Sequence, residues 1–149
     1  MIEIVNSKID SNDLLTKVST NRTGAVVLFQ GNTREFTAGK QTTFLSYECY
    51  HEMAEQKLKE LREKAIQQWG LVDVAIVHRI GRVDPGETSV AIAVSSEHRK
   101  PAFEAGSWLI DMLKNVVPIW KQETWADGTT EWAHPQNNKT HSSSATQNS

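Results

Sequence analysis

The order of the predicted helices and strands most limits what this chain can fold into. Two long helices, His51–Trp69 and Pro101–Val116, each follow a pair of strand-like segments rather than a single one. A doubly wound parallel sheet alternates one strand with one helix. The predicted order, strand–helix–strand–strand–helix–strand–strand–helix–strand–strand, therefore favours an α+β fold.

Strand-like segments are marked by β-branched and aromatic residues or by continuous apolar runs. They are Ile2–Val5, Gly24–Phe29, Thr42–Tyr50, Val72–Ile80, Val90–Val94, Trp120–Trp125 and Thr130–Ala133. The turn residues Asp84–Glu87 predict a hairpin between the strands on either side, and Ala126–Thr129 predict a second hairpin. We expect Gln30–Phe36, between the second and third strands, to be a loop.

The helices are predicted from apolar residues that recur at helical spacing. A short helix is expected over Asp10–Val18. His51–Trp69 carries one apolar stripe and is followed by Gly70, a residue that commonly ends helices. Pro101–Val116 is apolar on most sides, which predicts a buried helix and makes a second subunit a candidate to cover part of it.

Composition limits the class of protein. The 149 residues are 38% hydrophobic and carry 16 basic against 18 acidic side chains, which fits one soluble domain and disfavours a general nucleic-acid or membrane binder. No apolar stretch approaches the ~20 residues that span a bilayer. Met1–Ser7 shows no signal-peptide pattern, so we expect a cytoplasmic protein.

The C-terminal segment differs in composition from the rest of the chain. Residues 136–149 contain no large apolar residue and one formal charge, Lys139. Such a segment cannot bury enough surface to offset its ordering entropy, so we expect it to be disordered. Residues 1–135 are expected to form the single domain.

Common catalytic and cofactor motifs are missing from the sequence. There is no glycine-rich phosphate-binding pattern and no metal-binding histidine spacing, so we expect neither a cofactor nor a metal. The single cysteine, Cys49, is interpreted as a structural thiol. Ser95 and Ser96 lie near His98, but a serine triad needs geometry that the sequence does not show.

Basic residues at the ends of the predicted elements remain as candidates. Arg34 follows the first buried strand, and His98 and Arg99 precede the second long helix, where free N–H groups favour an anion. Lys114 ends that helix, and Lys121 follows it. Each has a plain interpretation as a solvated charge, but Lys114 lies on a helix with little polar face and must reach water or meet an anion. The pattern favours a site for a small anionic substrate, such as a phosphorylated one, without naming a reaction.

Several motifs together resemble one family. Phe29–Arg34 is similar to the F-x-G-x-x-R loop of the catalytic (large) subunits of molybdopterin synthase, the MoaE family. His78–Gly81 with Pro85–Gly86 resembles that family's HRIG…PG hairpin. Ser96–Ala105 and Asp111–Lys121 resemble its S-x-HR…AFEA and D-x-LK…P-x-WK stretches, in the same order along the chain.

The resemblance implies a fold and a function. The fold is an α/β hammerhead with an additional antiparallel β subdomain. The enzyme is a sulfurtransferase that moves sulfur from the thiocarboxylated C-terminus of a small ubiquitin-like subunit to cyclic pyranopterin monophosphate (precursor Z). The product is molybdopterin, an intermediate of molybdenum cofactor biosynthesis. The implied assembly is a heterotetramer around a central homodimer of large subunits.

The resemblance also implies the site residues. Lys114 and Lys121 match the catalytic lysines, and no metal takes part in these steps. His98 and Arg99 match a pair that reaches the substrate phosphate from the neighbouring subunit. The positions that match substrate-binding residues are Phe29, Asn32, Thr33, Arg34, His98, Arg99 and Ile110.

The C-terminal region departs from the family pattern. Some members carry an arginine there that contributes to the partner subunit's site, whereas Trp132–Gln136 contains none and leaves His134 or Lys139 as candidate substitutes. The competing hypothesis is a dimeric, non-enzymatic module that binds an anionic phosphorylated metabolite.

Overall fold

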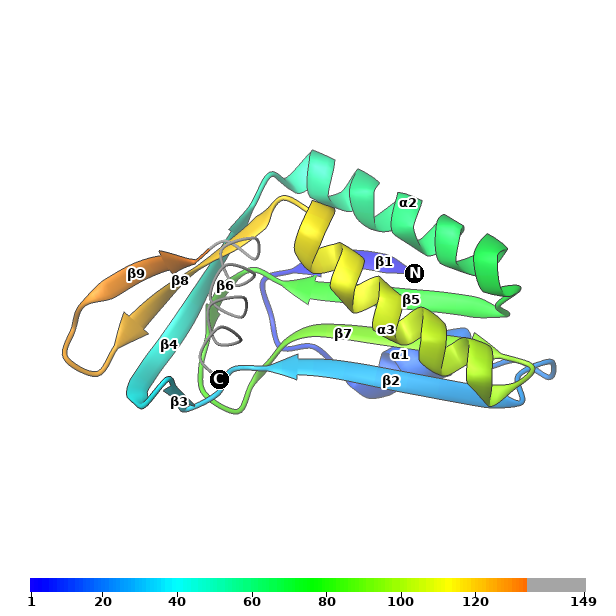
Figure 1. The fold of residues 1–149 in the computed structure, drawn as a ribbon, viewed down its shortest axis with the longest axis horizontal. Helices are drawn as coiled ribbons and strands as arrows, with labels where there is room; N and C mark the ends of the chain where they lie inside the picture. The colour runs from blue at the N-terminus through cyan, green and yellow to red at the C-terminus, as the bar shows by residue number, and fades with distance from the viewer. Residues whose placement is uncertain (134–149) are drawn as a thin grey trace, which may run out of the picture.

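Two β-sheets and three helices make up the computed structural model, which describes residues 1–133 (Figure 1). The predicted disordered tail, 136–149, lies outside the described residues. The first sheet has the strand order β1 (Ile2–Val5), β5 (Asp73–Arg79), β7 (Thr88–Ser96) and β2 (Ala25–Asn32). The second has the order β3 (Phe36–Thr37), β4 (Lys40–Cys49), β8 (Ile119–Trp125) and β9 (Thr130–Ala133), with β6 (Gly81–Val83) also paired to β4. The helices are α1 (Ser11–Val18), α2 (His51–Trp69) and α3 (Arg99–Val116).

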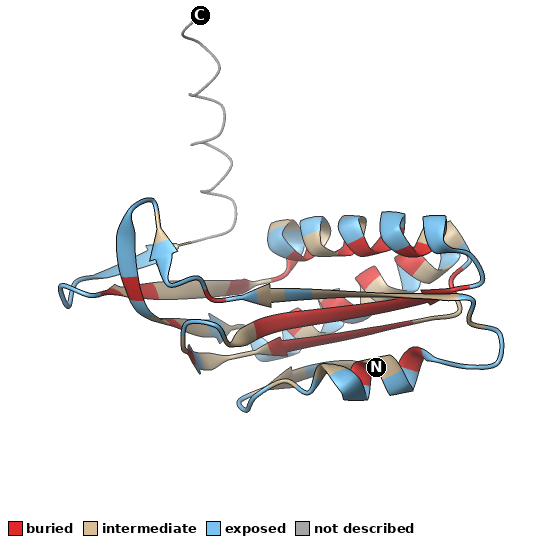
Figure 2. Cartoon of the chain, turned by 90° about the horizontal axis from the view of Figure 1, so that it is seen from below, coloured by how far each residue is buried: buried red, intermediate tan, exposed pale blue. Residues whose placement is uncertain are grey.

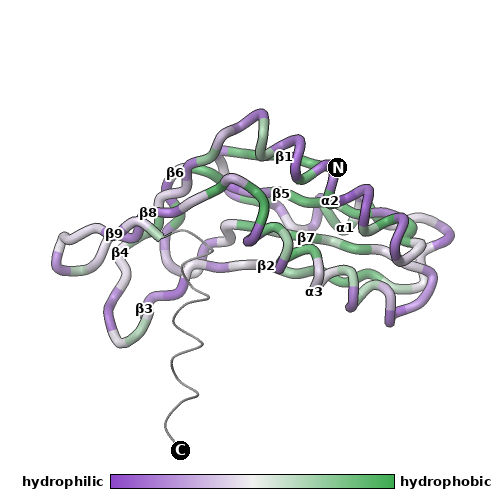
Figure 3. The backbone as a smooth tube through the Cα atoms, turned by 45° about the horizontal axis from the view of Figure 1, so that its top comes forward, coloured by the Kyte–Doolittle hydropathy of each residue, from purple (hydrophilic) through white to green (hydrophobic). Residues whose placement is uncertain are grey.

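Helices cover both faces of the first sheet: α2 and α3 lie on one side and α1 on the other (Figure 2). Alternate residues of its central strands therefore enter two cores. Val74, Ile76 and Ile92 share a core with α2 and α3, whereas Ala75 and Ala93 share one with α1. Burial on both faces explains why these strands read as continuous apolar runs, as Figure 3 shows for β5 and β7. The α+β prediction is confirmed.

The second sheet extends from one end of the first and forms the antiparallel subdomain that the resemblance implied (Figure 1). Its central strand is β4, which pairs with β3, β6 and β8. The predicted hairpin of β8 and β9 is confirmed. The other predicted hairpin, β5 with β7, also forms, but its connection contributes β6 to the second sheet. The chain changes direction at Gly81, the first residue of β6, which takes the left-handed conformation (φ 82°).

The predicted loop over Gln30–Phe36 is wrong at both ends, because its first three residues belong to β2 and Phe36 begins β3. Strand β2 continues to Asn32, because its partner β7 begins as early as Thr88 and pairs with it. The register shifts between Gly31 and Asn32, so a β-bulge ends the strand. This irregularity turns the chain out of the first sheet before Arg34.

The helix predictions hold with small shifts. Helix α2 has the predicted bounds, and Gly70 takes the left-handed conformation (φ 60°) while its N–H group donates to the Ile66 carbonyl. Helix α3 begins at Arg99, two residues before Pro101. Proline suits the first turn of a helix because a backbone N–H group there has no acceptor within the helix. Phe103 on α3 is 63% exposed in the single chain. None of the helices in residues 1–133 is long and apolar enough to cross a membrane.

Candidate functional site

Three cationic side chains from separate elements converge where the two sheets meet. Lys121 lies on β8, Lys114 in the last turn of α3, and Arg34 just after β2. Burial lowers the pKa of the Lys121 ammonium, Glu123 opposes that shift, and the charges of Lys114 and Arg34 lower the pKa further. The mutual influence of these charges shows that the structure brings together three of the residues predicted from sequence.

Helix α3 brings Lys114 to this place because it crosses the first sheet obliquely, from the start of β2 toward the end of the sheet where the second sheet begins (Figure 1). Gly106 packs on β2: a Cβ atom added there would lie 3.8 Å from Cγ1 of Val27. Ile110 and Phe29 both pack against the core between the first sheet and the helices α2 and α3. Lys114 lies one helical turn beyond Ile110.

Glu123 supplies the negative charge of the cluster, although the sequence analysis did not select it. Its side chain is buried, at 9% exposure, and Oε1 accepts a hydrogen bond of 2.6 Å from Oγ1 of Thr42. Residues two apart on a strand share a face, so Glu123 lies on the same side of β8 as Lys121. The signal in the sequence that could have identified Glu123 is its position two residues after Lys121 on one strand.

Two uncharged ionisable side chains adjoin the cluster. Tyr47 on β4 is the register partner of Lys121, and burial raises the pKa of its phenol. The Tyr47 ring meets the ring of His78 edge-on, with centroids 5.2 Å apart. Burial lowers the pKa of His78 to about 4, so this imidazole is neutral at neutral pH. Lys121 is therefore flanked by neutral groups on its β4 side.

The predicted binding loop is anchored unevenly. The Asn32 side-chain oxygen accepts a hydrogen bond of 2.7 Å from the Thr88 hydroxyl. Thr33 is buried, at 3% exposure, and its hydroxyl has no hydrogen-bond partner among the described residues. Arg34 is exposed. The first two residues are thus held by the fold, and the third is free to meet a ligand.

His98 and Arg99 are not brought to this cluster within one chain. His98 is the N-cap residue of α3 and Arg99 its first residue, whereas Lys114 lies 15 residues further along. At 1.5 Å per residue, this separates the two ends by about 22 Å. Both side chains are exposed. The predicted site residues therefore form two groups, one at each end of α3.

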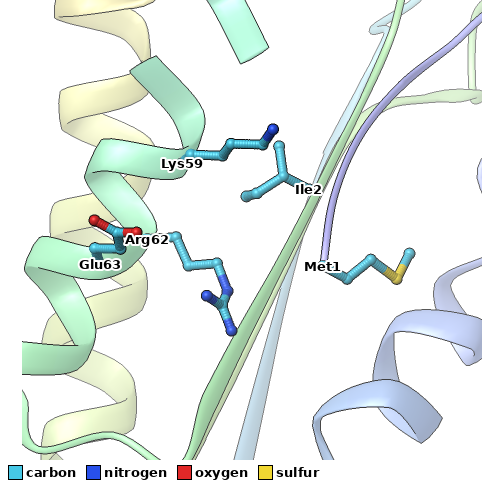
Figure 4. A pocket seen from close by; sticks show the side chains of 5 residues that line it. All are labelled: Met1, Ile2, Lys59, Arg62 and Glu63. Atoms are coloured by element: carbon cyan, nitrogen blue, oxygen red, sulfur yellow. The ribbon is translucent and has the colours of Figure 1, made fainter. Parts of the chain in front are cut away.

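A surface pocket between α2 and the start of β1 lies apart from the predicted residues. Met1, Ile2, Lys59, Arg62 and Glu63 line it (Figure 4). Its two cations already have partners. Arg62 forms a 2.7 Å ion pair with Asp73 and donates to the Val74 carbonyl, and Lys59 lies 3.2 Å from Glu55. The pocket therefore offers less unpaired positive charge than the cluster around Lys121.

The described residues hold no group of three or more His, Cys, Asp or Glu side chains that could bind a metal ion. Cys49, a free thiol, is half-buried, and burial raises its pKa. A raised pKa disfavours the reactive thiolate form. The cluster of Lys114, Lys121 and Arg34 is suited to electrostatic stabilisation of anions and to proton transfer through lysine.

Known proteins similar to this chain include catalytic subunits of molybdopterin synthase. The family described as MoaE protein matches residues 4–116. The molybdopterin synthase catalytic subunit of Bacillus subtilis (strain 168) is 43% identical over 134 residues, covering 90% of this chain and 85% of that one. The subunit of the same name from Staphylococcus carnosus (strain TM300) is 45% identical over 130 residues, covering 87% and 86%.

A solved structure agrees with these relatives. The X-ray crystal structure of molybdopterin synthase from Staphylococcus aureus matches with a TM-score of 0.84 at 41% identity, covering 88% of this chain and 95% of that chain. The resemblance seen in the sequence motifs is thereby confirmed. This chain belongs to the MoaE protein family.

Proposed function

We propose that this chain is the catalytic subunit of a molybdopterin synthase and acts as a sulfurtransferase. Its substrate is cyclic pyranopterin monophosphate, and its product is molybdopterin. The observation that supports this most is the convergence of Lys114, Lys121 and Arg34 in a chain whose relatives carry that enzyme's name.

The cluster suits the charges of the proposed reactants. The substrate carries a cyclic phosphate, and the sulfur donor is a thiocarboxylate at the C-terminus of a small ubiquitin-like subunit. Fixed cations in a partly desolvated site stabilise charge that develops as sulfur attacks and the phosphate ring opens. Lys121 has a lowered pKa and releases a proton more readily than an exposed lysine, so it is suited to proton transfer as well.

A second copy of the chain completes the proposed site. Strand β2 is at the edge of the first sheet, and its outer side has no strand partner among the described residues. Its start lies against Glu97: a Cβ atom added to Gly24 would be 2.1 Å from the Glu97 carbonyl oxygen. Antiparallel pairing of two β2 strands would set His98 and Arg99 of one copy near Arg34 of the other. The unpaired edge of β2 and the nearness of its start to His98 support a homodimer at the centre of the proposed heterotetramer.

Reconstitution tests the proposal. The chain alone should make no product; with the thiocarboxylated small subunit and cyclic pyranopterin monophosphate it should form molybdopterin, detected as its fluorescent oxidised pterin. Lys121→Ala should lower turnover by about 10²–10³-fold or more, because it removes a cation that stabilises the transition state. Lys64→Ala, at an exposed position of α2, is the matched control and should keep full turnover.

Two results would overturn the proposal. Wild-type chain that binds the substrate but forms no product would indicate the non-enzymatic binding module instead. Unchanged turnover in Lys121→Ala would exclude a catalytic role for that lysine.

A further inference from the structure

The turn Asp84–Glu87, which contains the Pro-Gly part of the HRIG…PG motif, contacts the binding loop directly. The Thr33 N–H donates to the Glu87 carbonyl at 3.0 Å, and the Gly86 N–H donates to the Thr33 carbonyl at 2.8 Å. Gly86 has a φ of 83°, a conformation that glycine adopts without strain. Both backbone groups of Thr33 are therefore bonded to this turn.

The residues before Thr33 are held by the first two residues of β7, which directly follow this turn. The Thr88 hydroxyl donates to the Asn32 side-chain oxygen, and the Ser89 hydroxyl donates to the Gly31 carbonyl at 3.1 Å. Gly31, Asn32 and Thr33 are thus all bonded to the turn and to the first two residues of β7. These bonds add to the pairing of β2 with β7, whose register shifts between Gly31 and Asn32.

One ion pair in turn holds this segment. Glu87 accepts a hydrogen bond of 3.1 Å from Nη1 of Arg79 through Oε2, and one of 3.2 Å from the Asp84 N–H through Oε1. The hydrogen bond from Arg79 is the main reason why the pKa of Glu87 lies below its usual range. Lys8 lies 3.7 Å from the same carboxylate, but its side chain is 83% exposed.

Arg79 is the less exposed partner of this pair. Its side chain is 12% exposed, and its buried Nε atom has no hydrogen-bond partner among the described residues. A buried guanidinium without compensation is costly, so Arg79 depends on the Glu87 carboxylate. The nearby pair of Arg82 and Asp84 is much more exposed. Within residues 1–133, the hydrogen bonds of Asn32 and Thr33 go to other residues.

We propose that Arg79 and Glu87 are positioning residues that hold the Asn32–Arg34 loop in the conformation that binds substrate. They contact the loop through the backbone of the turn and do not themselves belong to the cation cluster. The inference rests on the proposed function for the identity of the substrate. It gives the HRIG…PG motif a role that the catalytic chemistry leaves unassigned.

Steady-state kinetics of the reconstituted enzyme test this role. Arg79→Met and Glu87→Gln should each raise KM for cyclic pyranopterin monophosphate about tenfold while kcat changes less than about threefold, because the loop binds substrate and the lysines remain in place. The KM of the double variant should not exceed that of the more impaired single variant, since the two residues act as a unit. Lys57→Met, which removes a lysine–glutamate pair on α2, is the control and should leave KM unchanged.

Hydrogen exchange gives a readout that needs no activity. In Arg79→Met, the Thr33 amide should exchange at least about tenfold faster than in the wild type, while the Ile76 amide in the first sheet stays protected. An unchanged KM together with unchanged Thr33 exchange would overturn the inference. If the wild type makes no product, the proposed function fails, and exchange at Thr33 still decides whether Arg79 holds the loop.

Discussion

At the scale of single residues, the charge state of Lys121 depends on opposing neighbours. Glu123 raises its pKa and Lys114 lowers it, while burial lowers it most. Glu123→Gln should therefore lower the Lys121 pKa further, and Lys114→Met should raise it. NMR titration of selectively labelled lysine measures both shifts in the folded chain.

The opposite signs make this test specific. A general loosening of the fold would admit water and move the Lys121 pKa upward in both variants. Shifts in the same direction would therefore contradict the assignment of these two charges. Thr42→Val, which removes the 2.6 Å hydrogen bond but keeps the Glu123 charge, serves as the matched control.

At the scale of elements, the junction of β2 with the start of α3 is tightly packed. A Cβ atom on Gly24 would lie 2.1 Å from the backbone oxygen of Glu97, so Gly24→Ala must displace the backbone just before His98. We expect this change to lower the free energy of unfolding by about 2–4 kcal/mol, in the range of strongly destabilising substitutions. Gly106→Ala is the matched control, because its new Cβ would make an ordinary 3.8 Å contact with Val27.

Urea unfolding of the two alanine variants checks this prediction. Gly106→Ala should be neutral or stabilise the chain by up to about 1 kcal/mol, because alanine has the higher helix propensity. Equal stability of both variants would contradict the close approach of β2 to Glu97. The comparison isolates sterics at one position, since both substitutions add the same methyl group.

The same elements show how far the sequence could predict the fold. The bounds of α2 were predictable because its apolar stripe and Gly70 are local signals. The end of β2 was not, because pairing with Thr88 and a bulge, which are non-local, carry the strand to Asn32. Strand β6 was missed because it is three residues long and exists only through its pairing with β4.

The candidate site was predictable only in part for a related reason. Charge and position singled out Arg34, Lys114 and Lys121 as separate residues, and only the family resemblance assigned them to one site. Glu123 was missed because a carboxylate in a strand reads as a solvent-facing residue. Its burial depends on Thr42, a hydrogen-bond partner 81 positions away.

At the scale of the whole molecule, the proposed site is composite. His98 and Arg99 lie about 22 Å from Lys114 in one chain, so they share a site only if two copies pair. Two-fold pairing then gives each dimer two sites, and each site takes its lysines from one copy and its His98–Arg99 pair from the other. A defect in either group inactivates the site to which that group belongs. In a dimer of two chains with different defects, both defects can fall in one site and leave the other site intact.

Mixing two defective chains tests this arrangement. Lys121→Ala and Arg99→Ala should each have low activity alone. When the two are co-expressed, half of the dimers are mixed, and each mixed dimer has one intact site, so activity should recover to about a quarter of the wild type. If the site lay within one chain, every site would keep a defect and mixing would restore nothing. A co-expressed pair of Lys121→Ala and Lys114→Ala, whose defects lie in the same group, should stay inactive and controls for recovery by other routes.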